Sequence, residues 1–165
     1  MAYINPAPGT TSQIVLKLDV ASSVDDLSLG ASPLTVLALQ DITINASNDV
    51  FTWSQLDSPA KKQVATTSTN SVSMNCVVDS ASFFGSNLSA AQTGTVAEQG
   101  LLGLSRNKTL VTFSLKFEEG GASDKFIKGV GYITGLAPTI SADSPVWVTP
   151  ITITVSGEYT ASATE

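Results

Sequence analysis

The stretch GVGYITG, residues 129–135, decides how the rest of the sequence is interpreted. Its glycines suggest a dinucleotide-binding loop, which needs the spacing G-x-G-x-x-G between a strand and a helix. Gly129, Gly131 and Gly135 are spaced one residue too widely, and the LAPTISADSPVW that follows has two prolines and no helical pattern. In a strand the three glycines share one face with Ile133, and glycine there suits a bulge, a bend or a closely packed element. The stretch therefore predicts a strand and not a phosphate-binding loop.

Apolar and polar residues alternate through most of the chain, the period of two that is typical of β-strands. The alternating runs are 14–20, 34–46, 72–78, 109–118 and 147–159. Each predicts a strand with an apolar face toward a core and a mostly polar face. The exceptions are 94–105, where we expect one short helix, and 48–70, which is far longer than a hairpin loop of about 2–5 residues. We expect a single all-β domain over residues 1–165, with roughly six or seven strands and a long loop at 48–70.

The charge pattern argues against tight binding of nucleic acid. The 165-residue chain has a formal net charge of −6, and its largest basic cluster is the pair Lys61-Lys62. Tight binding needs several phosphate contacts from lysine or arginine. The chain can still lie beside DNA without gripping it. No apolar run is long enough to span a membrane, and the first residues, MAYINPAPGTTSQ, do not resemble a signal peptide.

The sequence lacks the residues of a catalytic site. It contains no histidine, and its one cysteine, Cys76, alternates with apolar Met74 and Val78, which favours a core position. We therefore expect no enzyme activity and no cofactor. The pair Asp25-Asp26 favours solvated turn charges, with a weak calcium site left open because the spacing of a strong site is absent.

The order of elements is similar to that of the tail tube (major tail) proteins of long-tailed phages. The most specific part is FSLKFEEGGASDKFIKGVGYITGLAPTISADSPVWVTPITITVSGEY, residues 113–159, with a strand, a glycine-containing strand, a proline-containing turn and a final strand ending near Ser-Gly. The segment FTWSQLDSPAKKQVATTSTNSV, residues 51–72, resembles the long loop of that family.

This resemblance implies a structural virion protein. The implied fold is a β-sandwich with a flanking helix, whose inner sheets join into a continuous barrel in a ring of six copies. Rings would stack around a tape-measure protein, and DNA would later pass through. The implied partners are the chain itself, the tape-measure protein, a tail terminator and initiator or distal tail proteins, with no membrane. The implied location is the virion tail, after assembly in the host cytoplasm. The acidic balance favours a conduit that repels DNA.

Two sets of residues are candidates for these roles. The expected contacts between rings are Phe51, Trp53, Leu56, Lys61 and Lys62. The first choice for the lumen is Asp41, Thr43, Asn45, Ser71, Ser73, Asn75 and Asp79, and the second is Thr112, Ser114, Lys116 and Glu118. Alternation does not decide whether such a face lines a lumen or an outer surface. A different class stays open: a monomeric or trimeric β-sandwich that binds a receptor or glycan, or decorates a virion, through exposed aromatic residues.

Overall fold

The computed structural model describes residues 14–36, 39–89, 94–117, 124–141 and 144–165, which form one antiparallel sheet and two short helices. The strands are β1 (Ile14–Val20), β2 (Leu34–Val36), β3 (Leu39–Gln55), β4 (Ser58–Val77), β5 (Leu110–Phe117), β6 (Lys125–Leu136), β7 (Thr139–Ser141), β8 (Ser144–Val155) and β9 (Thr160–Ser162). The helices are α1 (Ser80–Phe84) and α2 (Val96–Arg106). The strand order is β2-β1-β5-β6-β8-β4-β3, with β7 beside β8 and β9 beside β6. The predicted all-β class is confirmed.

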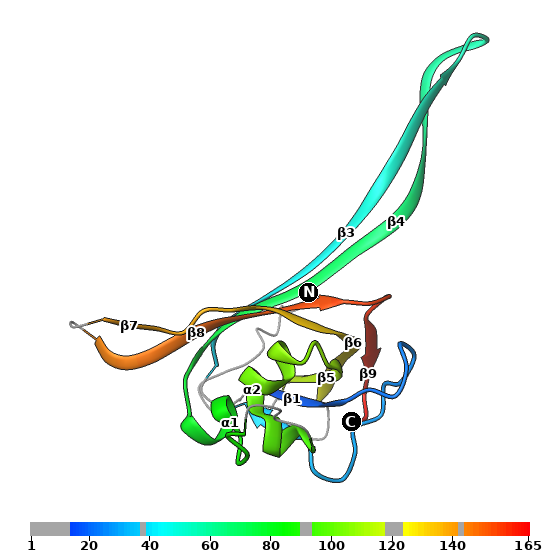
Figure 1. The fold of residues 1–165 in the computed structure, drawn as a ribbon. Helices are drawn as coiled ribbons and strands as arrows, with labels where there is room; N and C mark the ends of the chain where they lie inside the picture. Colours follow the sequence, from blue (N-terminus) through cyan, green and yellow to red (C-terminus); the bar gives the residue numbers. More distant parts are fainter. Residues whose placement is uncertain (1–13, 37–38, 90–93, 118–123, 142–143) are drawn as a thin grey trace, which may run out of the picture.

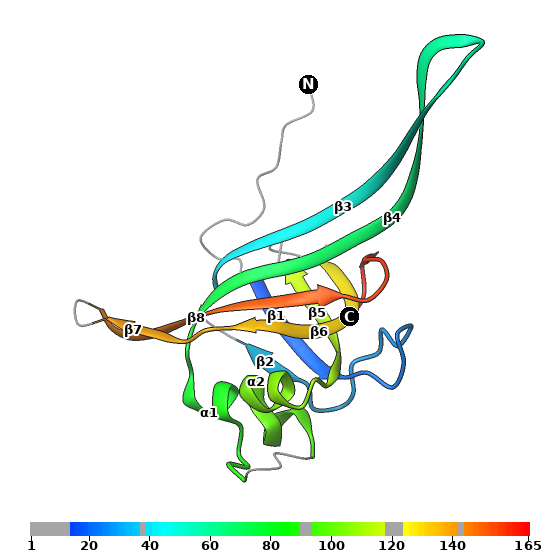
Figure 2. The same cartoon turned by 45° about the horizontal axis from the view of Figure 1, so that its top comes forward.

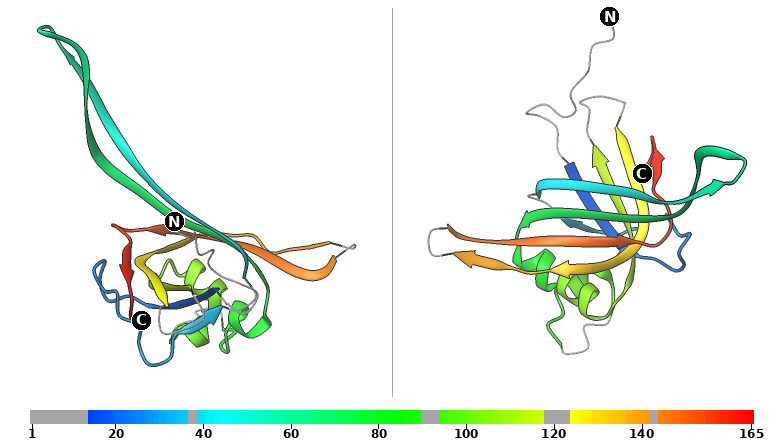
Figure 3. Two further views of the ribbon diagram at one scale, coloured as in Figure 1. Left: turned by 180° about the vertical axis from the view of Figure 1, so that it is seen from behind. Right: turned by 90° about the horizontal axis from the view of Figure 1, so that it is seen from above.

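The sheet folds over into two layers, and β6 belongs to both (Figure 1). Residues 125–132 of β6 pair with β5, and residues 131–136 pair with β8. Seen from above, β1 and β5 cross β4 and β8 at a steep angle (Figure 3). Crossed layers of this kind need a strand that bends from one layer into the other. The strand that makes the corner is GVGYITG, the stretch that the sequence identifies as decisive.

The glycines of β6 are explained by close packing at this corner. A Cβ on Gly129 would lie 2.7 Å from Cζ of the fully buried Phe113. A Cβ on Gly131 would collide with the backbone carbonyl of Thr154, because β5 and β8 both approach β6 there. The expectation of a strand with closely packed neighbours is therefore confirmed.

The core lies between the two layers and beneath the helices. Its fully buried side chains come from strands of both layers and from α2, and the largest are Phe113, Leu16, Leu18, Met74, Leu101, Leu104, Leu115, Ile151 and Ile153. Cys76 is buried in the same cluster, as expected, and burial raises the pKa of its thiol. Both helices cover the side of the body that faces away from the long hairpin β3–β4 (Figure 2).

The helix expected at 94–105 is α2, and α1 is additional. The two helices pack closely because glycines stand where the backbones meet: a Cβ on Gly85 would collide with α2, and one on Gly100 would collide with the end of α1. Gly100 has φ +61° and interrupts the helix with a kink. No helix in the described ranges is long and apolar enough to cross a lipid bilayer.

The largest departure from expectation concerns residues 48–70, which are not a loop. They form most of a hairpin in which β3 pairs with β4 from Leu39 to Gln55, with irregularities that include one between Asn48 and Val50. Residues 46–69 extend past the end of β8, and we call this part the arm (Figure 1).

A second, shorter hairpin leaves the body on the other side. Thr139 of β7 pairs with Val148 of β8, and the first residues of β8 extend past the end of β4 at Val77. We call residues 139–141 and 144–148 the short hairpin. In Figure 1 it points away from the arm.

Candidate functional site

Six of the predicted lumen residues lie together on one polar face. Three cross-strand pairs place them directly opposite one another on β3 and β4: Asp41 with Asn75, Thr43 with Ser73, and Asn45 with Ser71. The alternate residues, such as Ile44 and Val72, pack on the core side. The period of two therefore assigned these six residues to the correct side of both strands.

The polar face continues across β8 and the second half of β6, which contain none of the predicted lumen residues. Thr154 lies between Ser71 on β4 and Tyr132 on β6, and Thr152 pairs with Ser73. The hydroxyl groups of Thr134 and Thr154 lie 2.8 Å apart. We define the polar face as Asp41, Thr43, Asn45, Ser71, Ser73, Asn75, Tyr132, Thr134, Thr152 and Thr154. The alternation in β8 did indicate that Thr152 and Thr154 share a polar side. Only the register of the strands shows that this side continues the polar side of β4.

The polar face is rich in hydroxyl and amide groups and holds one charge. Asp41 is its single charged side chain, and the Asn75 amide donates to both carboxylate oxygens, at 2.8 and 3.1 Å. The net charge of −6 is therefore located mostly off this face. An acidic conduit lined by this face would have one carboxylate per subunit.

Asp79 does not belong to the polar face. It lies past the end of β4, and its carboxylate caps α1 by accepting from the backbone nitrogen and hydroxyl of Ser82, at 2.9 and 3.0 Å. These bonds hold the pKa of Asp79 below its usual value. Its place in the lumen was predicted from an alternation that ends where the strand ends.

Two of the four residues in the second set of lumen candidates, Thr112 and Ser114, do not lie on an open face. Thr112 and Ser114 are fully buried, and the Thr112 hydroxyl donates to the Asp26 carbonyl. Alternation placed them correctly on the face of β5 opposite Phe113, but that face is itself buried within the subunit, at Thr112 against the backbone of Asp26. Lys116 forms an ion pair with Asp124 at 3.1 Å. Glu118 lies outside the described residues.

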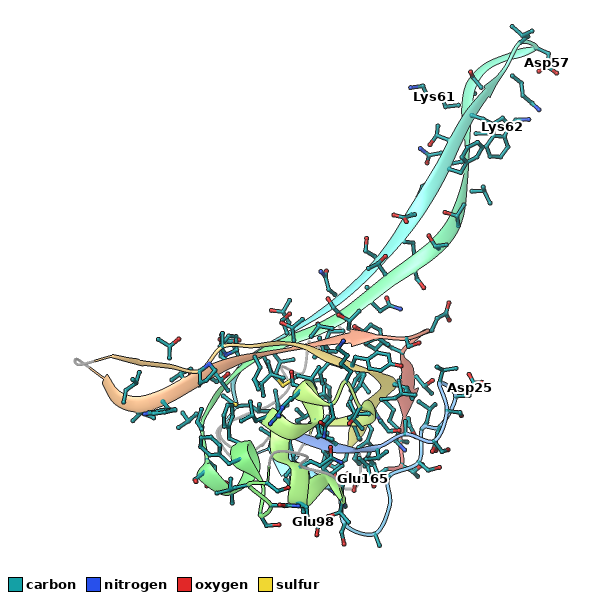
Figure 4. The ribbon with its side chains drawn as sticks, viewed as in Figure 1. Asp25, Asp57, Lys61, Lys62, Glu98 and Glu165 are labelled. Carbon is teal, nitrogen blue, oxygen red and sulfur yellow. The ribbon has the colours of Figure 1, made fainter. Side chains whose placement is uncertain are left out.

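An exposed aromatic pair marks the outer part of the arm. The rings of Phe51 and Trp53 stack with centroids 5.9 Å apart, and Phe51 is 60% exposed. Val64, opposite Phe51 in the register, adds a third apolar side chain to this face. Lys61 and Lys62 lie nearby toward the turn (Figure 4). Leu56 is fully exposed at the turn itself.

The base of the arm is fastened to the body by the segment after β8. The buried Asn70 side chain donates to the carbonyl oxygen of Gly157 at 2.8 Å. The Tyr159 hydroxyl donates to the carbonyl oxygen of Ser71 at 2.6 Å, and the carbonyl oxygen of Asn45 lies 3.1 Å from the same hydroxyl. Both strands of the hairpin are thus held where they leave the body.

An open apolar groove of about 400 Å³ lies where the short hairpin meets α1. It is lined by Val78, Ser80, Phe84, Val146 and Trp147. Trp147 is 42% exposed, and its backbone carbonyl accepts from the nitrogen of Val78 at 2.8 Å, which joins the two walls.

The layer that carries the polar face has two outer edges. β3 is at one end of the strand order and pairs within the described residues with β4 alone. On the other side of β8 lie the second half of β6 and β7. The four strands β6, β8, β4 and β3 alternate in direction, so β3 of one copy and β6 of another would meet antiparallel.

The described residues include no group of three or more side chains suited to hold a metal ion. The Asp26 carboxylate accepts from the Ser22 hydroxyl at 2.7 Å and from the backbone nitrogens of Ser22 and Ser28. The Ser22 hydroxyl is the largest of the effects that hold the pKa of Asp26 low. These bonds show that the Asp26 carboxylate stabilises the turn between Ser22 and Ser28.

No protein-family model and no curated protein sequence matches the chain. Solved structures of viral tails and injection systems do match. The SPP1 tail tube aligns with a TM-score of 0.62 at 11% identity, over 94% of this chain and 78% of that one. A chain from the tail of an empty gene transfer agent particle, determined with C6 symmetry, aligns with a TM-score of 0.60 at 11% identity. The alignment covers 89% of this chain and 95% of that one. A chain from the sheath–tube complex of an extracellular contractile injection system aligns with a TM-score of 0.55 at 14% identity. The alignment covers 96% of this chain and 93% of that one.

These matches show that the chain has the fold of phage tail tube proteins. They confirm, at the level of the fold, the resemblance found in residues 51–72 and 113–159.

Proposed function

We propose that this chain is a structural subunit that assembles into stacked hexameric rings and forms the tube of a virion tail. The observation that carries the proposal is the layer with the polar face. Its two outer edges, β3 and the second half of β6, lie on opposite sides of the layer and run in opposite directions. Long unpaired strand edges are a liability unless another strand covers them. The match to a tail computed with C6 symmetry supports six copies.

In this proposal β3 of each copy pairs with the β6–β7 edge of its neighbour in the ring. Six copies with four strands each would give a closed barrel of 24 strands (6 × 4), and closure covers both outer edges of this layer. The polar face then lines the lumen, and the apolar face keeps its place against the core. Six Asp41 carboxylates per ring (6 × 1), among hydroxyl and amide groups, offer phosphate groups no cation to bind, so DNA passes without being held.

The proposed partners follow from the same arrangement. Other copies of the chain form the ring and the stack, a tape-measure protein fills the lumen before DNA, and terminator and initiator or distal tail proteins meet the two ends. We propose that the chain is located in the virion tail, which is assembled in the host cytoplasm. Its proposed role is structural and not enzymatic. The alternative of a monomeric or trimeric glycan-binding or decoration module draws its support from the exposed Phe51–Trp53 pair.

Hydrogen exchange before and after assembly tests the ring contact. We expect the backbone amides of residues 39–48 and of residues 133–141 to become protected together when dispersed protein assembles, because each edge supplies the partner of the other. Residues 110–117 of β5, which pair on both sides within the subunit, serve as the internal control. Assembly with no gain of protection at either edge would contradict the proposal. If the protein never assembles and binds to a glycan array, the result would favour the alternative of a glycan-binding module.

A further inference from the structure

The arm and the short hairpin project from opposite ends of the same strands. β4 and β8 run antiparallel and pair from Ser71 with Thr154 to Val77 with Val148. The arm continues beyond the first of these pairs, and the short hairpin continues beyond the last. Figures 1 and 3 show the two hairpins leaving the body on opposite sides. A second copy stacked along the strand direction would therefore bring its short hairpin toward the arm of the first.

Both projections carry an apolar surface that remains exposed among the residues the structure describes. On the arm it is the face formed by Phe51, Trp53 and Val64. At the short hairpin it is the groove of about 400 Å³ with Val146 and Trp147 on one wall. Exposed apolar clusters of this kind are typical of protein–protein contacts, and aromatic residues dominate the binding energy in such contacts.

We propose that the arm of one copy docks into the groove of the next copy along the tube, with Phe51 and Trp53 packing on Val146 and Trp147. This inference rests on the proposed stacking function and names the surface that receives the arm. It makes the contact heterologous, since two different patches meet and every copy carries both. Such a contact does not close on itself, so it continues from layer to layer and produces an open-ended stack.

Charge complementarity favours a second copy as the occupant. Lys61 and Lys62 lie close to the aromatic pair, and the register places Lys62 opposite Trp53. At the groove, Asp79 stands between the lining residues Val78 and Ser80, and its carboxylate is exposed at the start of α1. A docked arm would bring opposite charges together at the margin of the contact, where they guide orientation more than they add affinity.

A mixing experiment with two variants tests this contact. Trp53→Asp damages the arm and Trp147→Asp damages the groove; both side chains lie at exposed or half-exposed positions, so each variant is expected to fold. Alone, neither variant stacks. In a mixture the intact arms of Trp147→Asp copies meet the intact grooves of Trp53→Asp copies. We expect native mass spectrometry to show paired layers with equal numbers of both variants and no longer stacks.

The control is Leu88→Asp, which places an acid at an exposed apolar residue between α1 and α2, outside the sequence of both hairpins and not among the groove-lining residues. We expect this variant to build tubes as the wild type does. The inference is overturned if wild-type protein builds tubes while the two tryptophan variants do not pair, or if either tryptophan variant alone still stacks. Loss of stacking in Leu88→Asp would overturn it too, since an acid anywhere on the surface would then suffice.

A cross-linking measurement covers the case in which either tryptophan variant misfolds. The photoreactive residue p-benzoylphenylalanine replaces Phe51, and tubes are irradiated and digested. We expect cross-links from position 51 to a peptide that contains Val146 and Trp147, or to one that contains Val78 to Phe84, of another copy. Tubes that cross-link only elsewhere would overturn the docking site and leave the proposed function intact. Wild-type protein that forms neither rings nor tubes would count against the proposed function itself.

Discussion

The hydroxyl of Tyr159 donates a hydrogen bond to the backbone carbonyl oxygen of Ser71, 2.6 Å away, at the point where the arm leaves the body. The same ring meets Phe113 edge to face, with centroids 6.3 Å apart. Phe113 in turn occupies the space that Gly129 leaves free. A continuous set of contacts thus connects the corner of the sheet at Gly129 to the base of the arm at Ser71.

Replacing Tyr159 with Phe removes this hydrogen bond and keeps the ring. We expect the free energy of unfolding to fall by about 1 kcal/mol, the usual net value of such a bond. Chemical denaturation measures the change. Tyr132→Phe, at an exposed tyrosine of β6, is the matched control and should leave the midpoint unchanged. Equal midpoints for the two variants would contradict a fastening role for Tyr159.

Alkaline pH should weaken the same contact. Burial raises the pKa of folded Tyr159 above the ordinary value of 10.0, against the smaller opposing effect of the bond to Ser71. A raised folded pKa means that this contribution is complete below about pH 10 and is lost as pH rises through the folded pKa. We expect the melting temperature of the wild type to fall more steeply above pH 10 than that of Tyr159→Phe. Parallel curves would show that the hydroxyl contributes nothing.

Alanine at Gly131 should be among the most destabilising substitutions in the chain. Its Cβ would meet the backbone carbonyl of Thr154, which has no rotamer through which to move away. We expect a loss of about 3 kcal/mol, at the upper end of typical overpacking costs. Gly157→Ala is the comparison, because a Cβ there meets nothing within 4 Å and adds only the strain of φ +104°. Thermal melts in which Gly157→Ala is the less stable variant would contradict the corner assignment.

Shortening the arm should separate folding from assembly. We expect a variant with Asn48 joined to Ser68 through an Asn-Gly turn to fold, because these residues pair directly and the arm contributes nothing to the core. It should unfold at the temperature of the wild type and fail to stack. Electron microscopy that shows tubes of normal length would refute the assignment of the arm to ring stacking.

Charge reversal on the polar face tests its place in the lumen. Asp41→Lys replaces the single carboxylate of that face with a cation, which should attract DNA and slow its passage. Asp25→Lys makes the same change of charge at an exposed residue of the body, away from the polar face (Figure 4). We expect slower ejection for Asp41→Lys alone, measured as DNA release from virions assembled with each variant. Equal ejection rates would place the polar face outside the lumen.

The residues whose structure was predicted correctly are those with one face against the core. β1, β5 and the body parts of β3 and β4 alternate because burial demands it, so their polar and apolar sides were assigned from the period of two. The arm has no core beneath it. Its faces are both exposed, its register has irregularities, and its turn at Leu56 and Asp57 lacks the usual Asn-Gly signal, so nothing in the pattern marked it as strand.

The remaining errors have similar physical causes. α1 has five residues, too few for a helical period to emerge, and Asp79 before it continued the alternation of β4 by coincidence. Thr112 and Ser114 face away from the core, as predicted, but alternation carries no information on which distant segment covers a face. The groove at Trp147 combines residues of β8 with residues of α1, and only the fold brings these together.

The proposed tube is tested most directly by negative-stain electron microscopy of the purified protein at high concentration. We expect rings with sixfold symmetry and hollow tubes made of stacked rings. Uniform dispersed monomers or closed trimers at every concentration, also when the protein is mixed with the other tail proteins of its virion, would contradict it.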